Sequence, residues 1–459
     1  MNRRWAGRRK RRLVIACAAV VGGFWLGQAR AADIDWEKVG DEAVELLGEY
    51  IRIRSVNPPA HTVETAAFLK RILEAEGIEV KTYESEPGKV NLLARLPAAP
   101  DVSHPPRPLL LLHHMDVVPV DASRWPVEPF SGVIRDGQIY GRGAADMKEV
   151  GIIHLLTLVT LKRRHVPLGR DVLLLATADE ETGGEAGARW MIENHWDELD
   201  PEYVLDEGGF GARDVLAADG KLVFAVSVAE KKIVWVKLRA TGTAGHGSQP
   251  MRDNPNVLLA RALAAIAARP SGPRPNAVIE ELRARIGALA SNKFTRAIQR
   301  DTLSVTTLRS GVGDPPKVNV IPSTAEATID CRLLPDTDVD RFLSDLLAGL
   351  PGRDRLRLEV LYRMDQTAVT PHDTGLFSAI AKAIQREHPD AIVTPFLIPY
   401  GTDSNTFRTR GVKAYGLIPM VLDASIIASM HSDAERVPVA ELGRGVRIFY
   451  NAIADFCGR

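Results

Sequence analysis

The sequence predicts an α/β protein in which a doubly wound, mixed-sheet catalytic domain contains an inserted α+β domain. Strand-like apolar runs alternate with helical apolar stripes in the first part of the chain, as in doubly wound α/β folds. From about Lys232 the order becomes strand–helix–strand–strand–helix–strand, which is typical of a ferredoxin-like domain. After Met364 the α/β pattern resumes. Residues 232–363 therefore form the predicted insert, a lid or dimerisation domain, between catalytic parts 33–231 and 364–459.

The first catalytic part begins with two helices. Apolar side chains recur with helical spacing over 36–53, and the proline-containing segment 55–59 ends this pattern. A second helix is expected over 62–76, with Gly77 as its C-terminal stop. The remaining elements alternate in the order strands 78–83 and 91–96, a leucine strand that begins at Leu109, helix 148–162, strand 171–178, helix 184–194 and strand 203–205.

The insert is expected to have four strands and two main helices. The strands are predicted at 232–240, 303–309, 325–333 and 355–361, and the helices at 256–268 and 339–350. Residues 269–300 begin with several prolines and glycines and are expected to form a loop and an additional helix inside the insert. The second catalytic part then contains a helix at 374–387, a loop around Gly401 and a final helix at 440–456.

Residues 1–31 have the three parts of a cleaved secretory signal. They are an arginine-rich start, an apolar stretch over 13–27, and Ala29-Arg30-Ala31 before the expected cleavage point after Ala31. The apolar stretch is short for a membrane span, so we expect a periplasmic or secreted protein with no stable membrane anchor. The arginines before the apolar stretch loosely resemble a twin-arginine signal, so the general secretory and twin-arginine routes both stay open.

The charge of the chain argues against nucleic acid as a partner. Without the eight basic side chains of residues 1–31, the chain has 50 basic and 58 acidic side chains, a net charge of −8. Phosphate binding needs a basic face, and no long lysine–arginine run follows the first 31 residues. Only Cys331 and Cys457 remain after the signal segment, which gives little support for a structural disulfide.

The leucine strand ends in a His-x-Asp pair that suggests metal chemistry. Four consecutive leucines at 109–112 suit a strand buried on both faces. Period-two alternation puts His114 and Asp116 on one side of this strand and His113 on the other. Further acidic groups follow later strands, at Asp146, at Asp179-Glu180-Glu181 and at Asp206-Glu207.

Acidic groups in these positions predict a two-metal hydrolase. Open α/β sheets gather their ligands at the carboxyl ends of the strands. Carboxylates massed in one apolar fold repel one another unless cations neutralise them. Imidazole nitrogen with carboxylate oxygen is a ligand set that suits zinc, cobalt or manganese.

Five motifs together resemble those of a known family. They are His114-Met115-Asp116, Gly141-Arg142-Gly143-Ala144-Ala145-Asp146-Met147-Lys148, Asp179-Glu180-Glu181-Thr182-Gly183-Gly184, Leu205-Asp206-Glu207-Gly208-Gly209 and His431-Ser432-Asp433-Ala434-Glu435. In these motifs the chain resembles the co-catalytic zinc amidohydrolases, which include aminoacylase-1, carboxypeptidase G, succinyl-diaminopimelate desuccinylase, carnosinase and carboxypeptidase S. The resemblance extends over most of the chain after the signal segment.

The resemblance implies two Zn²⁺ ions, with Co²⁺ or Mn²⁺ as alternatives, and a role for each matching residue. The implied metal ligands are His114, Asp146, Glu181, Asp206 and His431. Asp146 would bridge the two metals. Asp206 and Glu207 compete for one position, and the Asp-Glu-Gly-Gly form, which resembles carboxypeptidase S, favours Asp206. Glu180 would be the general base for a hydroxide held between the metals, and Asp116 would orient the imidazole of His114.

The resemblance also assigns substrate contacts. His246, in a glycine-rich loop of the insert, would stabilise the oxyanion, often from the partner subunit of a homodimer. Asn319 and Arg332 match positions that grip the carboxylate of the substrate, for which arginine offers a bidentate clamp. Gly401 matches a loop that lines the same pocket.

These roles imply an exported hydrolase that cleaves amide bonds in substrates with a free carboxylate. The favoured substrate is a small peptide, cleaved by a carboxypeptidase- or dipeptidase-like reaction. The alternative is an N-acyl amino acid, cleaved as by an aminoacylase. A third reading is a binding protein that kept the fold and lost turnover, but such a protein would lack a ligand or the base, and none is missing.

Overall fold

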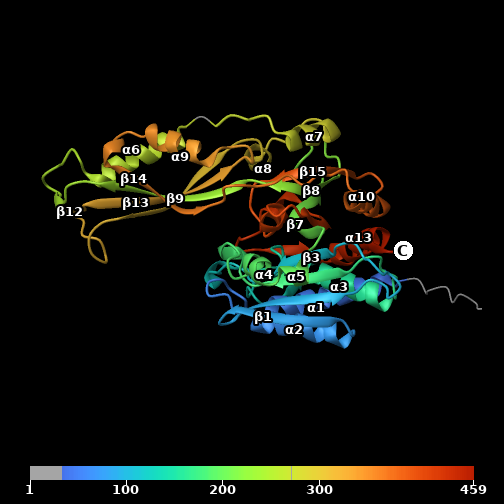
Figure 1. Ribbon diagram of the computed structural model, residues 1–459. Helices are drawn as coiled ribbons and strands as arrows, with labels where there is room; N and C mark the ends of the chain where they lie inside the picture. The colour runs from blue at the N-terminus through green and yellow to red at the C-terminus, as the bar shows by residue number, and fades with distance from the viewer. Residues whose placement is uncertain (1–33, 270) are drawn as a thin grey trace, which may run out of the picture. The chain divides into compact units, whose positions relative to one another are not determined.

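The computed structural model describes residues 34–269 and 271–459, so the predicted signal segment lies outside the described residues. Residues 35–459 form one compact unit. The predicted fold class is confirmed: a mixed catalytic sheet of eight strands accompanies an inserted antiparallel sheet of four strands (Figure 1). No helix among the described residues is long and apolar enough to cross a membrane.

The first catalytic part contains the following elements: α1 (Trp36–Arg52), α2 (Val63–Ala75), β1 (Glu79–Glu86), β2 (Lys89–Leu96), β3 (Leu109–His114), β4 (Val133–Arg135), β5 (Gln138–Tyr140), α3 (Lys148–Arg163), β6 (Val172–Thr177), α4 (Ala188–Asn194), α5 (Trp196–Leu199), β7 (Tyr203–Ala212) and β8 (Val223–Glu230). Short 3-10 turns lie at Ala122–Arg124 and Glu180–Thr182. Helix α1 begins where the Asp35 carboxylate accepts a hydrogen bond from Lys38 N (3.3 Å).

The insert contains β9 (Lys232–Thr241), β10 (Gly245–His246), α6 (Pro255–Ala267), α7 (Ala277–Ile286), α8 (Lys293–Ala297), β11 (Thr302–Ser310), β12 (Val320–Ile321), β13 (Thr324–Leu333), α9 (Val339–Ala348), a 3-10 turn (Arg353–Arg355) and β14 (Leu356–Arg363). The second catalytic part contains α10 (Gly375–Glu387), β15 (Ile392–Ile398), α11 (Ser404–Arg408), β16 (Lys413–Val421), α12 (Ala424–Ile427), β17 (Arg436–Pro438) and α13 (Val439–Cys457).

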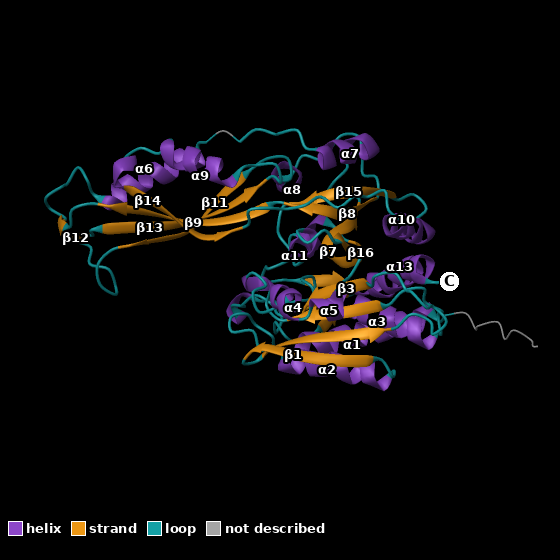
Figure 2. Ribbon diagram, in the orientation of Figure 1, coloured by secondary structure: helices purple, strands orange, loops and turns teal. Residues whose placement is uncertain are grey.

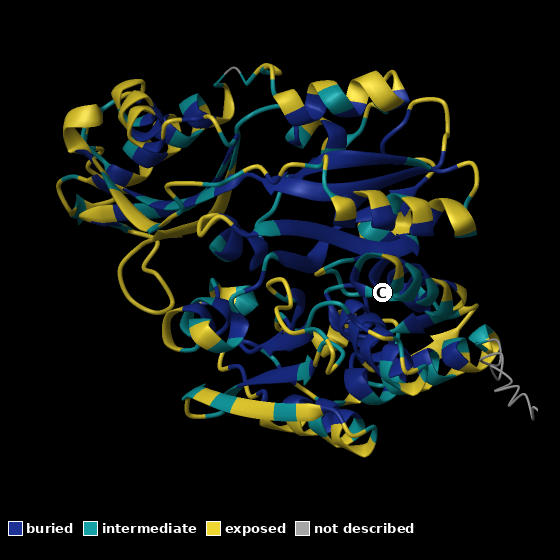
Figure 3. Ribbon diagram, turned by 45° about the vertical axis from the view of Figure 1, so that its right-hand side comes forward, coloured by how far each residue is buried: buried dark blue, intermediate teal, exposed yellow. Residues whose placement is uncertain are grey.

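The catalytic sheet has the order β1-β2-β6-β3-β7-β16-β8-β15, with helices on both faces (Figure 2). Parallel pairs join β6, β3, β7 and β16 in its centre. Helices α3 and α13 pack against β3 and β16. On the opposite face, apolar side chains of α4, α5 and α11 pack against β3, β6 and β7. The central strands are buried throughout, as doubly covered parallel strands require (Figure 3).

The sheet of the insert has the order β11-β13-β9-β14, which is the ferredoxin-like arrangement expected for this order of elements. Apolar side chains of α6 and α9 cover one face of β9 and β13. Alternate residues of β9 are buried, so this sheet has only one covered face.

Three details differ from the predictions. Helix α4 begins at Ala188 and not at residue 184, because Gly183 (φ 111°) and Gly184 (φ 74°) form a left-handed turn first. Strand β7 continues to Ala212 and does not end at Leu205, since its glycines allow close strand contact: a Cβ at Gly209 would lie 1.7 Å from Ala225 O. Strands β8, β15 and β16 were not predicted.

The additional helix of the insert, α7, also lies elsewhere than expected. It packs against β15 of the catalytic sheet, where Arg285 Nη1 donates to Val393 O (3.0 Å). Nearby, Ala290 N donates to Leu216 O (2.8 Å). Residues of the 277–297 segment therefore belong to the core of the catalytic domain, although they lie inside the insert in sequence.

Candidate metal centre

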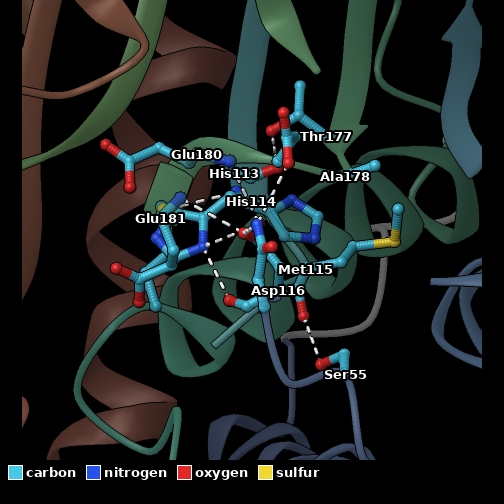
Figure 4. A network of polar contacts seen from close by, with 12 residues as sticks. Ser55, His113, His114, Met115, Asp116, Thr177, Ala178, Glu180 and Glu181 are labelled. Carbon is cyan, nitrogen blue, oxygen red and sulfur yellow. Dashed lines mark hydrogen bonds and ion pairs between the residues drawn. The ribbon is translucent and has the colours of Figure 1, made fainter. Parts of the chain in front are cut away.

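The acidic motifs meet at the carboxyl ends of β3, β6 and β7. His114 is the last residue of β3, Glu180 and Glu181 follow β6, and Glu207 lies within β7. Asp146 lies just before α3, and His431 follows α12. His113 and His114 turn to opposite sides of β3, as alternation predicts (Figure 4): His113 Nε2 lies 3.5 Å from the buried Tyr50 hydroxyl, whereas His114 faces Asp146.

Two groups of side chains are close enough to hold a metal ion each, and they share Asp146. The first group consists of His114, Asp146 and Glu207, whose ligand atoms lie within 4.8 Å of one another. His114 Nε2 is 3.2 Å from Asp146 Oδ1 and 3.7 Å from Glu207 Oε1.

The second group consists of Asp146, Glu181 and His431, again within 4.8 Å. His431 Nε2 is 2.9 Å from Asp146 Oδ2 and 3.3 Å from Glu181 Oε1. The two oxygens of Asp146 thus face different imidazoles, which is the geometry a bridging carboxylate needs.

Glu207 takes the position that the sequence analysis gave to Asp206, and this corrects our preference between the two. The Asp206 carboxylate turns to the start of α11, where Ser404 N and Ser404 Oγ donate to its Oδ2 (3.0 and 2.8 Å). Neighbouring residues of a strand point to opposite sides, so only one of the two acids can face His114. Asp206 instead fixes the loop that follows Gly401.

Asp116 connects the leucine strand to the motif with the two glutamates. Its Oδ1 lies 3.6 Å from His114 Nδ1, and its Oδ1 and Oδ2 accept hydrogen bonds from the backbone N–H groups of Glu180 and Glu181 (3.2 Å each). Asn57 Nδ2 also donates to Asp116 Oδ2 (2.7 Å). The sequence pattern indicates for Asn57 only a place in the segment that ends the first helix, yet its side chain is buried in this network.

A buried ion pair joins the two loops that carry Asp146 and His431. Glu435 Oε2 pairs with the Arg142 guanidinium, and Glu435 Oε1 accepts from Ala145 N (2.9 Å). Arg142 Nη2 donates to Ser432 O (3.1 Å). His431 has a left-handed backbone (φ 60°), which a residue other than glycine keeps only when its surroundings hold it there.

The charges of the site balance through its imidazoles. Hydrogen bonds to Asp146 and Glu181 raise the pKa of His431 to about 11. Burial raises the pKa of Glu180 and Glu207 well above the usual carboxyl range. Divalent cations between the same atoms would neutralise the carboxylates and leave both imidazoles free to ligate. The donor set of imidazole nitrogens and carboxylate oxygens therefore fits a pair of zinc-like ions.

The ligand groups open into a cavity of about 370 Å³ that Glu180 also lines. The insert contributes Trp235 from β9 and Arg332 from β13 to its wall, and Gly401 lines it from the catalytic domain. Arg332 Nε donates to Asp330 Oδ1 (2.8 Å), which holds the guanidinium at the cavity. Thus two of the predicted substrate contacts, Arg332 and Gly401, lie beside the metal ligands.

His246 and Asn319 are not brought to this cavity. They lie together in the small β10–β12 ribbon, where His246 pairs with Val320 and Gly247 N donates to Asn319 O (2.7 Å). His246 is exposed, with Nδ1 2.7 Å from Ser248 Oγ. Within one chain, His246 pairs with the strand that follows Asn319, and neither residue contacts the metal ligands.

Comparison with known proteins is decisive at this point: the model of peptidase family M20/M25/M40 matches residues 110–455. The chain belongs to this family. Aminoacylase-1 of Sus scrofa is 29% identical over 419 residues, which are 89% of this chain and 93% of that protein. An N-fatty-acyl-amino acid synthase/hydrolase of Mus musculus is 29% identical over 383 residues, 76% of this chain and 74% of that protein.

The fold of the M20/M25/M40 family is also seen in solved structures. An M20 family metallo-carboxypeptidase from Sulfolobus solfataricus matches with a TM-score of 0.67 at 21% identity, covering 91% of this chain and 99% of that one. This likeness concerns the fold. Membership of the family makes the protein a metallohydrolase that acts on amide bonds, as the sequence motifs predicted.

Proposed function

We propose that the protein hydrolyses amide bonds whose amine product carries a free carboxylate, and that it uses two Zn²⁺ ions. One observation carries this proposal: two ligand groups sharing Asp146 open into the same cavity as Glu180 and Arg332. The ligands would be His114, Asp146, Glu181, Glu207 and His431. When bound, the cations supply Lewis-acid activation of water and of the amide carbonyl.

Glu180 is the proposed general base and acid. It takes a proton from the attacking water and gives it to the nitrogen of the amide as the C–N bond breaks. The backbone N–H groups of Glu180 and Glu181 both donate to the Asp116 carboxylate. One carboxylate therefore positions both the proposed base, Glu180, and the proposed metal ligand, Glu181. His114 Nδ1 lies 2.9 Å from the backbone oxygen of Asp116 and 3.6 Å from its Oδ1, so Asp116 orients that imidazole toward the cation.

Arg332 is the proposed clamp for the free carboxylate of the substrate. It lines the cavity, and a guanidinium can bind a carboxylate through two parallel hydrogen bonds. His246 and Asn319 would complete the site from the partner subunit of a homodimer, with His246 donating to the oxyanion. This arrangement accounts for their distance from the ligands of their own chain.

Among amide substrates, the comparisons favour N-acyl amino acids over peptides. The peptidase was the first choice from the sequence, but aminoacylase-1 is similar over nearly all of the chain. The carboxylate clamp suits both kinds of substrate, so the acyl side must distinguish them. Export to the periplasm or the medium, through the signal-like residues 1–31, is part of the same proposal. The N-terminal sequence of protein recovered from the producing cells would test it, and a start near Ala32 is expected.

A substrate panel tests the proposed reaction. Purified protein should release amino acids from N-acyl amino acids faster than from dipeptides, lose this activity to a chelator and regain it with Zn²⁺. Glu180→Gln should lower kcat by about 10²–10⁴-fold at unchanged metal content. A protein that binds these substrates without turnover, with or without metal, would instead be a binding homologue.

A further inference from the structure

A second cavity, of about 390 Å³, adjoins the metal cavity. Its wall is mainly apolar, with the residues Val215, Phe294, Pro399, Tyr400, Ala424, Ile427, Ala428 and Met430. Tyr400 and Met430 line both cavities. These two side chains therefore form the boundary between the two cavities.

The shared wall is fixed in place. The Tyr400 hydroxyl donates to Gly208 O (2.5 Å), directly after the ligand Glu207. Met430 precedes the ligand His431. Because Tyr400 is hydrogen-bonded to the residue after Glu207 and Met430 precedes His431 in the chain, the second cavity has a defined position relative to the metal ligands.

The outer wall comes from α8, which the 277–297 segment brings to the catalytic sheet. The Phe294 ring lies between those of Phe210 and Phe396, with centroids 5.7 and 5.9 Å apart. Asn292 caps α8 through Thr295 N (2.9 Å), and its Nδ2 donates to Val215 O (2.8 Å). Aromatic packing and capping make this wall rigid, as a specificity pocket requires.

A third cavity, of about 370 Å³, adjoins the metal cavity on another side and has a different character. It shares Glu180, Ile233 and Gly401 with the metal cavity, and its wall includes three arginines and four acidic side chains. A hydrocarbon chain bound in this cavity would displace water from these charged groups, which costs free energy. The metal cavity therefore has a mainly apolar cavity on one side and a cavity with many charged side chains on another.

We propose that the apolar cavity binds the hydrocarbon chain of the acyl group, and that the preferred substrates are N-acyl amino acids with medium-length chains. This inference rests on the proposed amide hydrolysis. The amino acid half carries a carboxylate and needs Arg332, which lies in the metal cavity, whereas the one lysine of the apolar cavity, Lys293, is exposed. The volume of about 390 Å³ is more than ten times the roughly 30 Å³ that one water molecule occupies in the liquid, so the cavity has room for a medium-length chain.

The expected selectivity follows from the burial of methylene groups. Each added methylene that enters the cavity should raise kcat/KM about three- to fourfold. N-acetyl, N-butanoyl, N-hexanoyl and N-octanoyl derivatives of one amino acid form the test series. The octanoyl-to-acetyl ratio of kcat/KM should exceed a hundred in the natural protein.

Tryptophan substitutions that fill the cavity test its role. Ala428→Trp and Ala424→Trp each place an indole in the cavity from an exposed position of the α12 region, and either should lower the octanoyl-to-acetyl ratio at least tenfold. Ala284→Trp, at an exposed position of α7 outside the cavity, is the matched control and should keep the natural ratio. An unchanged ratio in both cavity variants would overturn the inference.

Binding separates this inference from the proposed reaction. Calorimetry with N-octanoylglycine and zinc-loaded protein that also carries Glu180→Gln, so that the ligand is not consumed, should show at least tenfold weaker affinity with Ala428→Trp than with Ala284→Trp. Equal affinities exclude the apolar cavity as the acyl site, whatever the turnover. Weaker affinity without hydrolysis of any amide would keep the cavity assignment and refute the proposed reaction.

Discussion

Replacing Glu435 by glutamine should weaken metal binding although Glu435 touches no cation ligand directly. Its carboxylate pairs with Arg142 and accepts from Ala145 N, so it links the loop of Asp146 to the loop of His431. Glutamine has nearly the same shape but no charge, and its amide N–H₂ would face the guanidinium. The substitution therefore removes the negative charge that pairs with Arg142. It also weakens the link between the loop of Asp146 and the loop of His431.

The expected magnitude follows from the burial of the pair. The side chains of Arg142 and Glu435 are 2% and 0% exposed, so solvent cannot replace the lost partner. Removing one member of a buried ion pair costs about 3–5 kcal/mol of folding free energy. Loss of a group that orients metal ligands typically lowers metal affinity about 10–100-fold.

Two assays measure these effects. Urea unfolding of the metal-free protein gives the change in folding free energy, and competition with a chelator gives the affinity for Zn²⁺. Glu202→Gln is the control, because Glu202 pairs with Arg170 (2.8 Å) at a more exposed place and contacts none of the metal ligands. It should cost about 1 kcal/mol or less and leave Zn²⁺ affinity unchanged. Natural Zn²⁺ affinity in Glu435→Gln would refute the argument that this pair holds the ligand loops.

Five further substitutions test single features. Glu207→Ala should remove about one equivalent of bound metal. Asp206→Ala should keep both metals and cost about 1–3 kcal/mol of folding free energy, because it leaves the donors of Ser404 unpaired. Elemental analysis and urea unfolding check this pair, and the reverse result would restore Asp206 as the metal ligand. Arg332→Met should raise KM about 10–100-fold for substrates with a free carboxylate but not for their amides, and equal effects on both would exclude the clamp. Burial lowers the pKa of Lys231 from 10.5 to about 7, so the unfolded chain binds a proton that the folded chain lacks between these pH values. Unfolding free energies at pH 7 and 9 should therefore show that Lys231→Met stabilises the protein more at pH 7, and a constant difference would contradict this. His246→Ala should lower kcat about 10²–10³-fold at unchanged molecular mass in solution, and a fully active variant would exclude His246 as the oxyanion donor.

Much of the fold and the centre could be predicted because local pattern determines them. The alternation of apolar runs and helical stripes depends on neighbouring residues, and it placed α1, α3 and the strands β3 and β6 correctly. The ligands follow strand ends, so a topology rule brought His114, Asp146 and Glu181 together before any distance was known.

The choice between Asp206 and Glu207 could not be made in this way. The pairing of β7 with β3 ends at Leu205 opposite Leu111, whereas its pairing with β16 continues past this point and β8 joins at Gly211. Alternation relative to β3 then no longer decides which acid reaches His114. The partner of Asp206 is Ser404, almost 200 residues later in the chain, and single-sequence patterns contain no signal for such a contact.

The position of α7 and α8 also depends on contacts between residues far apart in the sequence. It affects which functions fall to the insert and which to the catalytic domain. All proposed cation ligands come from the catalytic domain, whereas Arg332, Trp235 and Phe294 come from residues of the insert. Substitutions in the insert can therefore change which substrates are accepted while the cations stay bound. Because α8 packs onto the catalytic sheet, its part of the wall keeps its position relative to the ligands even if the sheet of the insert moves. We therefore expect acyl-chain selectivity to depend on α8 and α12, and recognition of the carboxylate to depend on the placement of β9 and β13.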